Sequence, residues 1–134
     1  EKGMEVSVNA QKAPLFVDGD SDALERVVEN IVINALVHGK ETLLAELCGD
    51  GHFARLVLEN ATDEISDTDT ELIFERFYTT DRSRTKKSTG LGLSIAKQLT
   101  IKMGGSISAY LKDGRFGIEV LIPLSQKEKG QIDA

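Results

Sequence analysis

The stretch between positions 22 and 39 constrains the fold most, because its apolar side chains recur with the period of a helix. The repeating apolar residues are Leu24, Val27, Val28, Ile31 and Ala35. Asp22 and Glu25 are placed like an N-cap and its partner three residues on, and Gly39 is placed like a stop. The pattern therefore predicts a helix whose apolar face packs against a second layer.

Most of the other apolar segments alternate with period two or form short runs, which predicts strands. They are "MEVSVNA" (4–10), "PLFVDG" (14–19), two strands within "ETLLAELCGDGHFARLVLEN" (41–60), "SISAYL" (106–111) and "FGIEVLIP" (116–123). Turns at 49–51 and 113–114 join neighbouring strands into antiparallel hairpins. Two more helices are expected, in "TELIFERFY" (70–78) and after position 90, the latter ending at Gly104-Gly105.

Charge and cysteine content limit the classes of function. A net charge of -6 argues against a general nucleic-acid or membrane-surface binder, because phosphate polyanions attract basic faces. The single cysteine, Cys48, excludes an internal disulfide and fits a reducing compartment. No apolar run approaches the roughly 18 residues of a membrane span, and the first residues lack signal-peptide character. We expect one cytoplasmic domain at positions 1–124 and a polar tail at 125–134.

Two asparagines lie beside the apolar face of the first helix. At about 100° per residue, Arg26, Asn30, Asn34 and His38 form one stripe where access to solvent is poor. A buried amide without a hydrogen bond costs roughly 1 to 3 kcal/mol, so each amide needs a partner. Two interpretations stay open. The amides bond to neighbouring backbone, which is the commoner case, or they line a polar cleft where an amide oxygen can bind Mg²⁺.

Two glycines, Gly90 and Gly92, open the last predicted helix and follow a cluster of cations. The cations are Arg76, Arg82, Arg84, Lys86 and Lys87. Unpaired N–H groups in a first helical turn carry partial positive charge, so the amides, the helix dipole and the cations all favour an anion. The segment lacks the Lys-Ser/Thr of a P-loop and does not follow a strand, which excludes the P-loop and dinucleotide motifs. Taken alone, such glycines are often only a hinge.

Taken in order, five segments resemble the catalytic and ATP-binding domain of bacterial sensor histidine kinases. They are "ERVVENIVINALVHG", "LIFERFY", "STGLGLSIAKQL", "KMGGSISA" and a strand that ends in "LIP". The resemblance covers about Val6 to Pro123 and extends to the wider GHKL superfamily of topoisomerase, mismatch-repair and chaperone ATPases. It implies the Bergerat fold, an α/β two-layer sandwich with an ATP lid. A mixed, mostly antiparallel sheet of about five strands would pack on three helices.

The resemblance also implies roles for single residues. Asn34 stands where the N-box asparagine of the family binds Mg²⁺, and Asn30 lies one helical turn before it. His38 replaces an aromatic residue that usually flanks the nucleotide, and Asn60 stands at the adenine-binding position. The expected ligands are therefore ATP and Mg²⁺.

The lid and the phosphate contacts are expected around the F-box and the glycine box. Phe74 and Phe77, with Tyr78, match the F-box, and the lid would cover about 78–88. Gly90 and Gly92 match the box whose amides meet the phosphates. The full set of expected ATP-binding residues is Asn30, Asn34, His38, Asn60, Ile65, Phe77, Tyr78, Arg82, Arg84, Lys86, Lys87, Ser88, Thr89, Gly90, Leu91, Gly92 and Leu93.

Position 30 separates kinase chemistry from ATP hydrolysis. ATPases of the superfamily carry there a glutamate that activates water, whereas Asn30 cannot act as a general base. The resemblance therefore implies a protein histidine kinase domain that passes the γ-phosphoryl group to a histidine on a separate dimerisation domain. Neither His38 nor His52 has the context of a phosphoacceptor, so the chain alone is not expected to phosphorylate itself.

The same resemblance implies the partners and the setting. The domain would belong to the cytoplasmic part of a membrane-anchored sensor in two-component signalling. Its dimerisation and histidine-phosphotransfer domain would be the direct partner, and a response regulator the indirect one. No nucleic acid and no membrane contact by this domain are expected.

Besides His38, four positions depart from the family pattern. Asn60 replaces an aspartate, and Thr62 and Glu64 stand where glycines are usual. Val37 stands at a place often held by lysine. An asparagine can still read adenine, because its oxygen accepts from the amino group while its NH₂ donates to a ring nitrogen. The alternative is a degenerate domain of the same fold that lacks effective nucleotide binding and acts as a regulatory or interaction module.

Overall fold

The computed structural model describes residues 5–38, 40–62, 67–76, 78 and 92–125. Its elements are β1 (Glu5–Ala10), α1 (Ser21–His38), β2 (Lys40–Gly49), β3 (Phe53–Ala61), α2 (Asp67–Leu72), α3 (Gly92–Lys102), β4 (Ser106–Lys112) and β5 (Arg115–Pro123). Among these residues, no helix has the length and apolar character that a membrane crossing needs.

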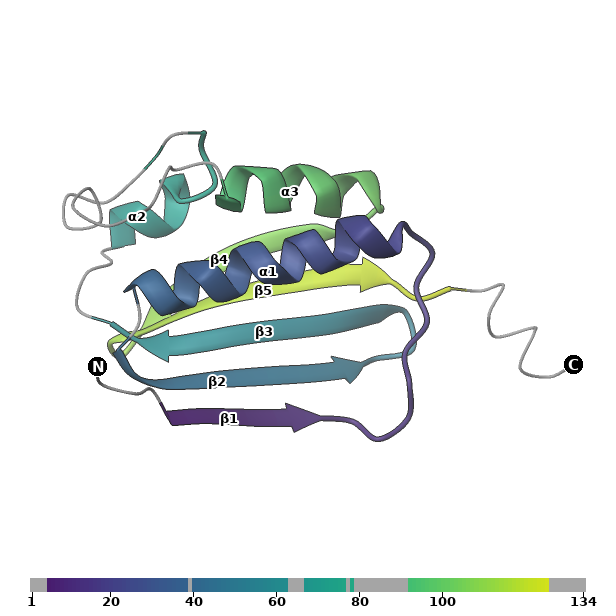
Figure 1. The fold of residues 1–134 in the computed structure, drawn as a ribbon, viewed down its shortest axis with the longest axis horizontal. Helices are drawn as coiled ribbons and strands as arrows, with labels where there is room; N and C mark the ends of the chain where they lie inside the picture. The colour runs from purple at the N-terminus through teal and green to yellow at the C-terminus, as the bar shows by residue number, and fades with distance from the viewer. Residues whose placement is uncertain (1–4, 39, 63–66, 77, 79–91, 126–134) are drawn as a thin grey trace, which may run out of the picture.

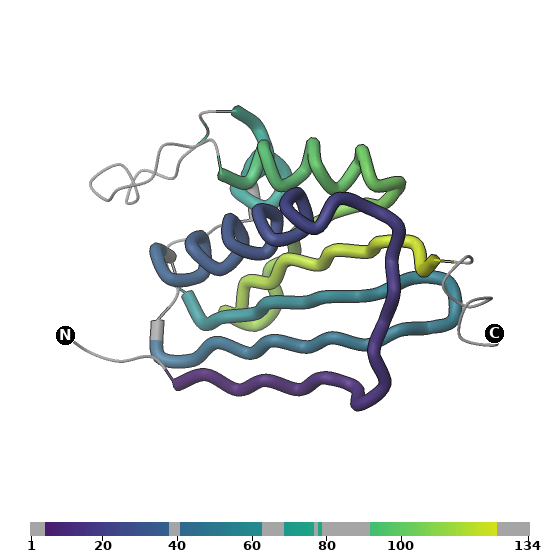
Figure 2. The backbone as a smooth tube through the Cα atoms, turned by 45° about the vertical axis from the view of Figure 1, so that its right-hand side comes forward, coloured from purple at the N-terminus to yellow at the C-terminus, as the bar shows by residue number. Residues whose placement is uncertain are grey.

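The described strands form one sheet in the order β1-β2-β3-β5-β4. β1 runs parallel to β2, and the other three pairings are antiparallel. The described helices lie on one face of this sheet (Figure 1), and the turned view in Figure 2 shows the same two layers. The predicted α/β sandwich with a mixed, mostly antiparallel sheet is confirmed.

The hydrophobic core lies between the sheet and the helices. Phe116, Ile118 and Val120 alternate along β5 and are at most 2% exposed. They belong to one cluster with Val27 and Ile31 of α1, which follow helical spacing. This packing fixes α1 on the sheet and so sets where the asparagines of α1 lie.

β1 is an edge strand with little cover. All six of its residues are exposed, including Val6 at 56% and Val8 at 71%. Period-two alternation therefore predicted the strand correctly, although both valines remain open to solvent. The reason is the placement of the helices, which contact β3 and β4 while β1 contacts its neighbour β2.

α1 begins at Ser21, and Asp20 is its N-cap. The Asp20 Oδ1 atom accepts a hydrogen bond from the Asp22 N–H at 3.0 Å, and the Asp20 carbonyl accepts from the Leu24 N–H at 3.0 Å. These are the two bonds of an N-cap residue. The prediction of Asp22 as the cap was wrong, because Asp20 offers the same carboxylate two residues earlier.

Two predicted elements differ from the structure. Residues 14–19 form no strand, and Val17 makes only an isolated bridge to Leu124, since this segment crosses the end of the sheet to reach α1 (Figure 1). The helix expected at 70–78 covers Asp67–Leu72 instead. The Glu75 N–H then donates to the Leu72 carbonyl at 2.9 Å, so turns of three-residue span replace the helical bonding pattern.

α3 ends in two glycines with different tasks. Gly104 has φ of 82° and donates its N–H to Ile101 O at 2.9 Å, while Gly105 donates to Thr100 O at 3.0 Å. These two bonds form a Schellman motif, which confirms the predicted stop. A Cβ on Gly105 would lie 2.1 Å from the Leu121 carbonyl oxygen, so this glycine lets β5 approach closely.

Candidate functional site

The start of α3 lies against the middle of α1. A Cβ placed on Gly92 would lie 3.7 Å from both Cγ and Oδ1 of Asn30, so the side chain of Asn30 faces the first residue of α3. The N–H groups of the first turn of a helix have no partner inside the helix. The structure thus brings together the amide of α1 and the helix start that sequence reasoning singled out separately.

The Asn30 amide nitrogen is buried and lacks a hydrogen-bond partner. Within the described part of the chain it is the one buried side-chain nitrogen or oxygen in that condition. An unsatisfied buried donor costs about 1–3 kcal/mol, and such a group is usually explained by a ligand or water. Bonding to neighbouring backbone, the commoner interpretation, is therefore not realised at this nitrogen.

Asn34 follows Asn30 by four residues on α1 and is half-buried. Its amide oxygen is a hard, neutral ligand of the kind that Mg²⁺ accepts. The described residues contain no group of three or more His, Cys, Asp or Glu that could hold a metal. A Mg²⁺ ion beside Asn34 would therefore take its other ligands from water and phosphate oxygens, which is its usual coordination in nucleotide sites.

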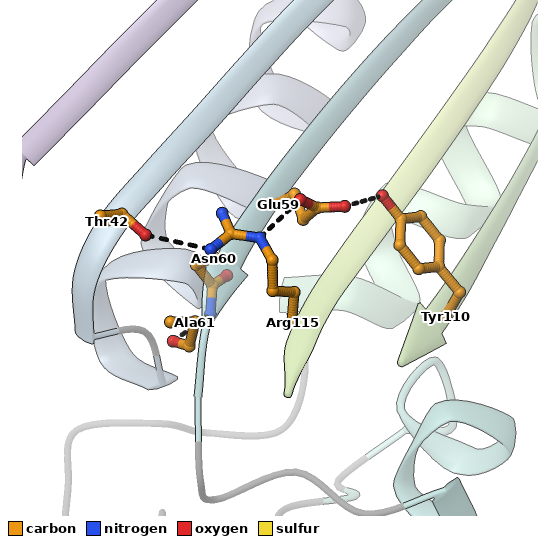
Figure 3. Close-up of polar contacts among 6 residues, drawn as sticks. All are labelled: Thr42, Glu59, Asn60, Ala61, Tyr110 and Arg115. Carbon is orange, nitrogen blue, oxygen red and sulfur yellow. Dashed lines mark hydrogen bonds and ion pairs between the residues drawn. The ribbon is translucent and has the colours of Figure 1, made fainter. Parts of the chain in front are cut away.

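Asn60 lies near the end of β3, on the face that carries the helices. It is 1% exposed and pairs with Phe116 of the core across the strands. Its Nδ2 atom donates to the carbonyl of Ala61 at 3.1 Å (Figure 3). Two residues on, the Thr62 N–H donates to Gly114 O at 3.1 Å, so the β4–β5 turn lies beside the end of β3.

The ends of two helices and one strand lie on the same side of the molecule. Both views place the C-terminal ends of α1 and β3 at one edge, and α3 begins a short way in from that edge, alongside α1 (Figures 1 and 2). Asn34, Asn60 and Gly92 come from these three ends. An elongated ligand with a base at β3 and an anion at α3 would span this edge.

The remaining expected residues divide into two groups. Tyr78 donates its hydroxyl to the carboxylate of Asp69 on α2, and Leu93 packs in the hydrophobic core at 7% exposure. The side chain of His38 lies outside the described residues, as do Ile65, Phe77, Arg82, Arg84, Lys86, Lys87, Ser88, Thr89, Gly90 and Leu91.

Comparison with known proteins decides the family. Residues 19–128 match the family described as histidine kinase-, DNA gyrase B-, and HSP90-like ATPase. The chain belongs to this family. The histidine-kinase-like domain is 35% identical over 115 residues to the sensor histidine kinase YcbM of Bacillus subtilis, covering 83% of this chain and 37% of YcbM. It is 32% identical over 139 residues to the sensor histidine kinase WalK of the same organism, covering 99% of this chain and 23% of WalK.

A solved structure gives the same answer. The mycobacterial sensor histidine kinase MprB superposes on the histidine-kinase-like domain with a TM-score of 0.79 and 29% identity, covering 90% of this chain and 84% of that chain. The resemblance to the catalytic and ATP-binding domain of sensor histidine kinases is thereby confirmed. The chain spans little more than a third of YcbM and about a quarter of WalK, so it corresponds to one part of such proteins.

Sequence reasoning missed a polar row on the outer face of the sheet in this histidine-kinase-like domain. The Tyr110 hydroxyl donates to Glu59 Oε2 at 2.6 Å, Arg115 Nε donates to Glu59 Oε1 at 2.7 Å, and Arg115 Nη1 donates to Thr42 Oγ1 at 3.3 Å (Figure 3). The one sequence signal for this row was the alternation of side chains along a strand, which puts Glu59 and Asn60 on opposite faces of the sheet.

Two pKa values reflect this row. Burial and the hydrogen bond to Glu59 raise the pKa of Tyr110 to about 12. The hydrogen bond from Tyr110, joined by that from Arg115, lowers the pKa of the Glu59 carboxyl below its ordinary value. Glu59 is therefore ionised at neutral pH, with both carboxylate oxygens engaged.

Proposed function

We propose that this domain binds Mg-ATP and positions the γ-phosphoryl group for transfer to a histidine on a separate dimerisation domain of its parent protein. The observation that carries the proposal is the buried, unpartnered Asn30 amide nitrogen beside the start of α3. A donor group needs an acceptor, and the open N–H groups of a helix start favour an anion. A phosphate group satisfies both needs at once. Because the chain belongs to an ATPase family, we assign this phosphate to ATP.

Each site residue then has a specific task. The Asn30 NH₂ and the first N–H groups of α3 donate to phosphate oxygens, and the Asn34 oxygen binds Mg²⁺. Asn60 contacts adenine through its amide oxygen, because its NH₂ is already bonded to Ala61 O. Bound Mg²⁺ would supply positive charge against the phosphates during transfer. From the sequence, the segment at about 78–88, which carries basic residues, is proposed to serve as the lid over the nucleotide.

The same site argues for transfer over hydrolysis. Asn30 stands one turn before Asn34 and cannot take a proton from water. Positioning and electrostatic stabilisation dominate phosphoryl transfer, so the domain needs no covalent chemistry of its own. We infer a protein histidine kinase domain of a two-component system, with a response regulator as its indirect partner.

One observation favours a second candidate function. Asn60 is 1% exposed and its NH₂ is engaged by Ala61, which leaves one group fewer to read adenine. A degenerate domain that serves as a regulatory or interaction module would have no need of that group.

Isothermal titration with a non-hydrolysable ATP analogue separates these two functions. We expect saturable binding that strengthens when Mg²⁺ is added. As a control for the effect of substitution itself, Asn9→Ala changes an exposed asparagine on β1 and should bind the analogue as the unaltered protein does. The absence of heat at millimolar analogue, with and without Mg²⁺, would favour the regulatory module.

A further inference from the structure

The polar row on the outer face lies directly behind Asn60. It runs from Thr42 on β2 through Arg115 on β5 and Glu59 on β3 to Tyr110 on β4 (Figure 3). Glu59 and Asn60 are adjacent in β3, so their side chains leave opposite faces from one shared peptide unit. Whatever holds Glu59 also holds the backbone that carries Asn60.

A glycine makes this row possible. In the sheet, Gly117 of β5 pairs with Tyr110 on one side and with Glu59 on the other. A Cβ on Gly117 would lie 2.2 Å from Cζ and 2.4 Å from the hydroxyl oxygen of Tyr110. The ring therefore crosses over β5 where no side chain stands and reaches a strand that is not its neighbour.

The sheet is irregular at the same place. The β2–β3 register shifts between Lys40 and Leu43, so two residues of β2 have no partner opposite the end of β3, and Glu41 has φ of 69°. Such a bulge disrupts the ladder locally. Asn60 is the residue that pairs with Leu43 beside it. The bond from Arg115 to Thr42 spans this bulge and connects it to Glu59.

The hydrogen bond of the Asn60 side chain cannot replace this support. Its partner is the carbonyl of Ala61, the next residue, so the bond moves with the strand end. By contrast, the Glu59 carboxylate is bonded to β4 and β5, and Arg115 links it on to β2. Contacts of Glu59 thus fix the end of β3 relative to the rest of the sheet.

We propose that Glu59, held by Tyr110 and Arg115, is a positioning residue that orients Asn60 and so sets the preference of the site for adenine. The inference rests on the proposed nucleotide-binding function. It assigns to the outer face of the sheet a specific influence on the base end of the ligand. The phosphate end, at Asn30 and α3, depends on other elements and should be insensitive to Glu59.

The test compares Glu59→Gln with a matched variant on the same face. Glu119 pairs with Arg55 between β3 and β5 and makes none of the hydrogen bonds of the row, so Glu119→Gln removes an equivalent charge while the partners of Glu59 stay in place. Each protein is titrated with the non-hydrolysable ATP analogue, its guanine counterpart and Mg-tripolyphosphate. For Glu59→Gln we expect affinity for the adenine analogue to fall about tenfold, comparable to losing one hydrogen bond to a charged group.

Tripolyphosphate affinity should then stay within about twofold, and Glu119→Gln should bind all three ligands as the unaltered protein does. Equal losses for the adenine analogue and tripolyphosphate would show a general structural defect and overturn the inference, as would no loss at all. If Glu59→Gln fails to fold, Tyr110→Phe, which removes only the hydroxyl, takes its place. The quantity compared is the ratio of the affinity for the adenine analogue to the affinity for tripolyphosphate. If the unaltered protein binds no nucleotide, the proposed function fails. If it binds nucleotide but the variants keep its ratio of adenine-analogue affinity to tripolyphosphate affinity, only this inference is overturned.

Discussion

Replacing Asn30 by leucine should stabilise the protein while removing nucleotide binding. Leucine has nearly the shape of asparagine but carries no donor, so the unsatisfied Nδ2 atom disappears. Removing that desolvation penalty should raise the free energy of unfolding by about 1–3 kcal/mol. Leucine also has the higher helix propensity, by a few tenths of a kcal/mol per residue, and α1 continues through position 30.

Urea unfolding with and without Mg-ATP measures both effects in one series. A ligand present at about 100 times its Kd adds about 2.7 kcal/mol to the stability of a protein that binds it only when folded. The unaltered protein should gain that increment, and Asn30→Leu should not. Asn9→Leu makes the same chemical change at an exposed position of β1 and should shift stability by no more than about 0.5 kcal/mol.

Two outcomes would refute this reasoning. A loss of stability in Asn30→Leu without nucleotide would mean that the amide has a partner in the folded protein. Full stabilisation of Asn30→Leu by Mg-ATP would mean that the buried amide does not contact the ligand. The first result bears on the structure of the site, and the second bears on its function.

Three further predictions concern the sheet and the metal. Gly117→Ala should destabilise the protein by about 2 kcal/mol, because the added Cβ displaces the Tyr110 ring and breaks its hydrogen bond to Glu59. In a Tyr110→Ala background the same change should be neutral or stabilising. Equal changes in the free energy of unfolding in both backgrounds, measured in urea, would contradict this explanation. In Tyr78→Phe, where Tyr110 is the remaining tyrosine and no tryptophan is present, ultraviolet titration should give a pKa of about 12 against the ordinary 10. Because that pKa is raised on folding, its stabilising contribution is complete below pH 10 and disappears as pH rises through about 12, whereas titration near 10 would remove the proposed bond. Asn34→Asp should weaken Mg²⁺-dependent binding of the ATP analogue more than metal-free binding, and an equal loss in both titrations would remove Asn34 from the metal site.

Long periodic segments were predictable from the sequence, and short polar ones were not. The α1 pattern and the β4–β5 hairpin are set by local spacing, so the structure reproduces both. The cap of α1 was misassigned because several short polar residues stand side by side there, and only the backbone bonds single out Asp20. The segment 14–19 is apolar enough for a strand, but it connects two layers and finds only one pairing partner, Leu124.

The proximity of two candidate site residues agrees with the sequence analysis, whereas the support behind a third, Asn60, could not be predicted from it. Helical spacing and the family resemblance pointed to Asn30 and Gly92, and the structure places them in contact range. The support of Asn60 depends on which strands lie side by side. In the sequence, Glu59 lies more than 50 residues before Tyr110 and Gly117. Only the strand order β3-β5-β4 brings these residues into one row.

The two faces of the sheet thus carry polar residues in opposite hydrogen-bonding states. On the outer face, Glu59 carries a full charge, yet both of its carboxylate oxygens are bonded within the chain. On the helical side, the amide nitrogen of the uncharged Asn30 is buried and has no hydrogen-bond partner within the described part of the chain. A charged group that is completely satisfied stabilises the fold without any ligand, whereas a neutral donor left unsatisfied destabilises the free protein by a penalty that a bound phosphate can remove. The property that separates these two residues is whether the fold supplies the hydrogen-bond partner, and burial and charge alone do not reveal it.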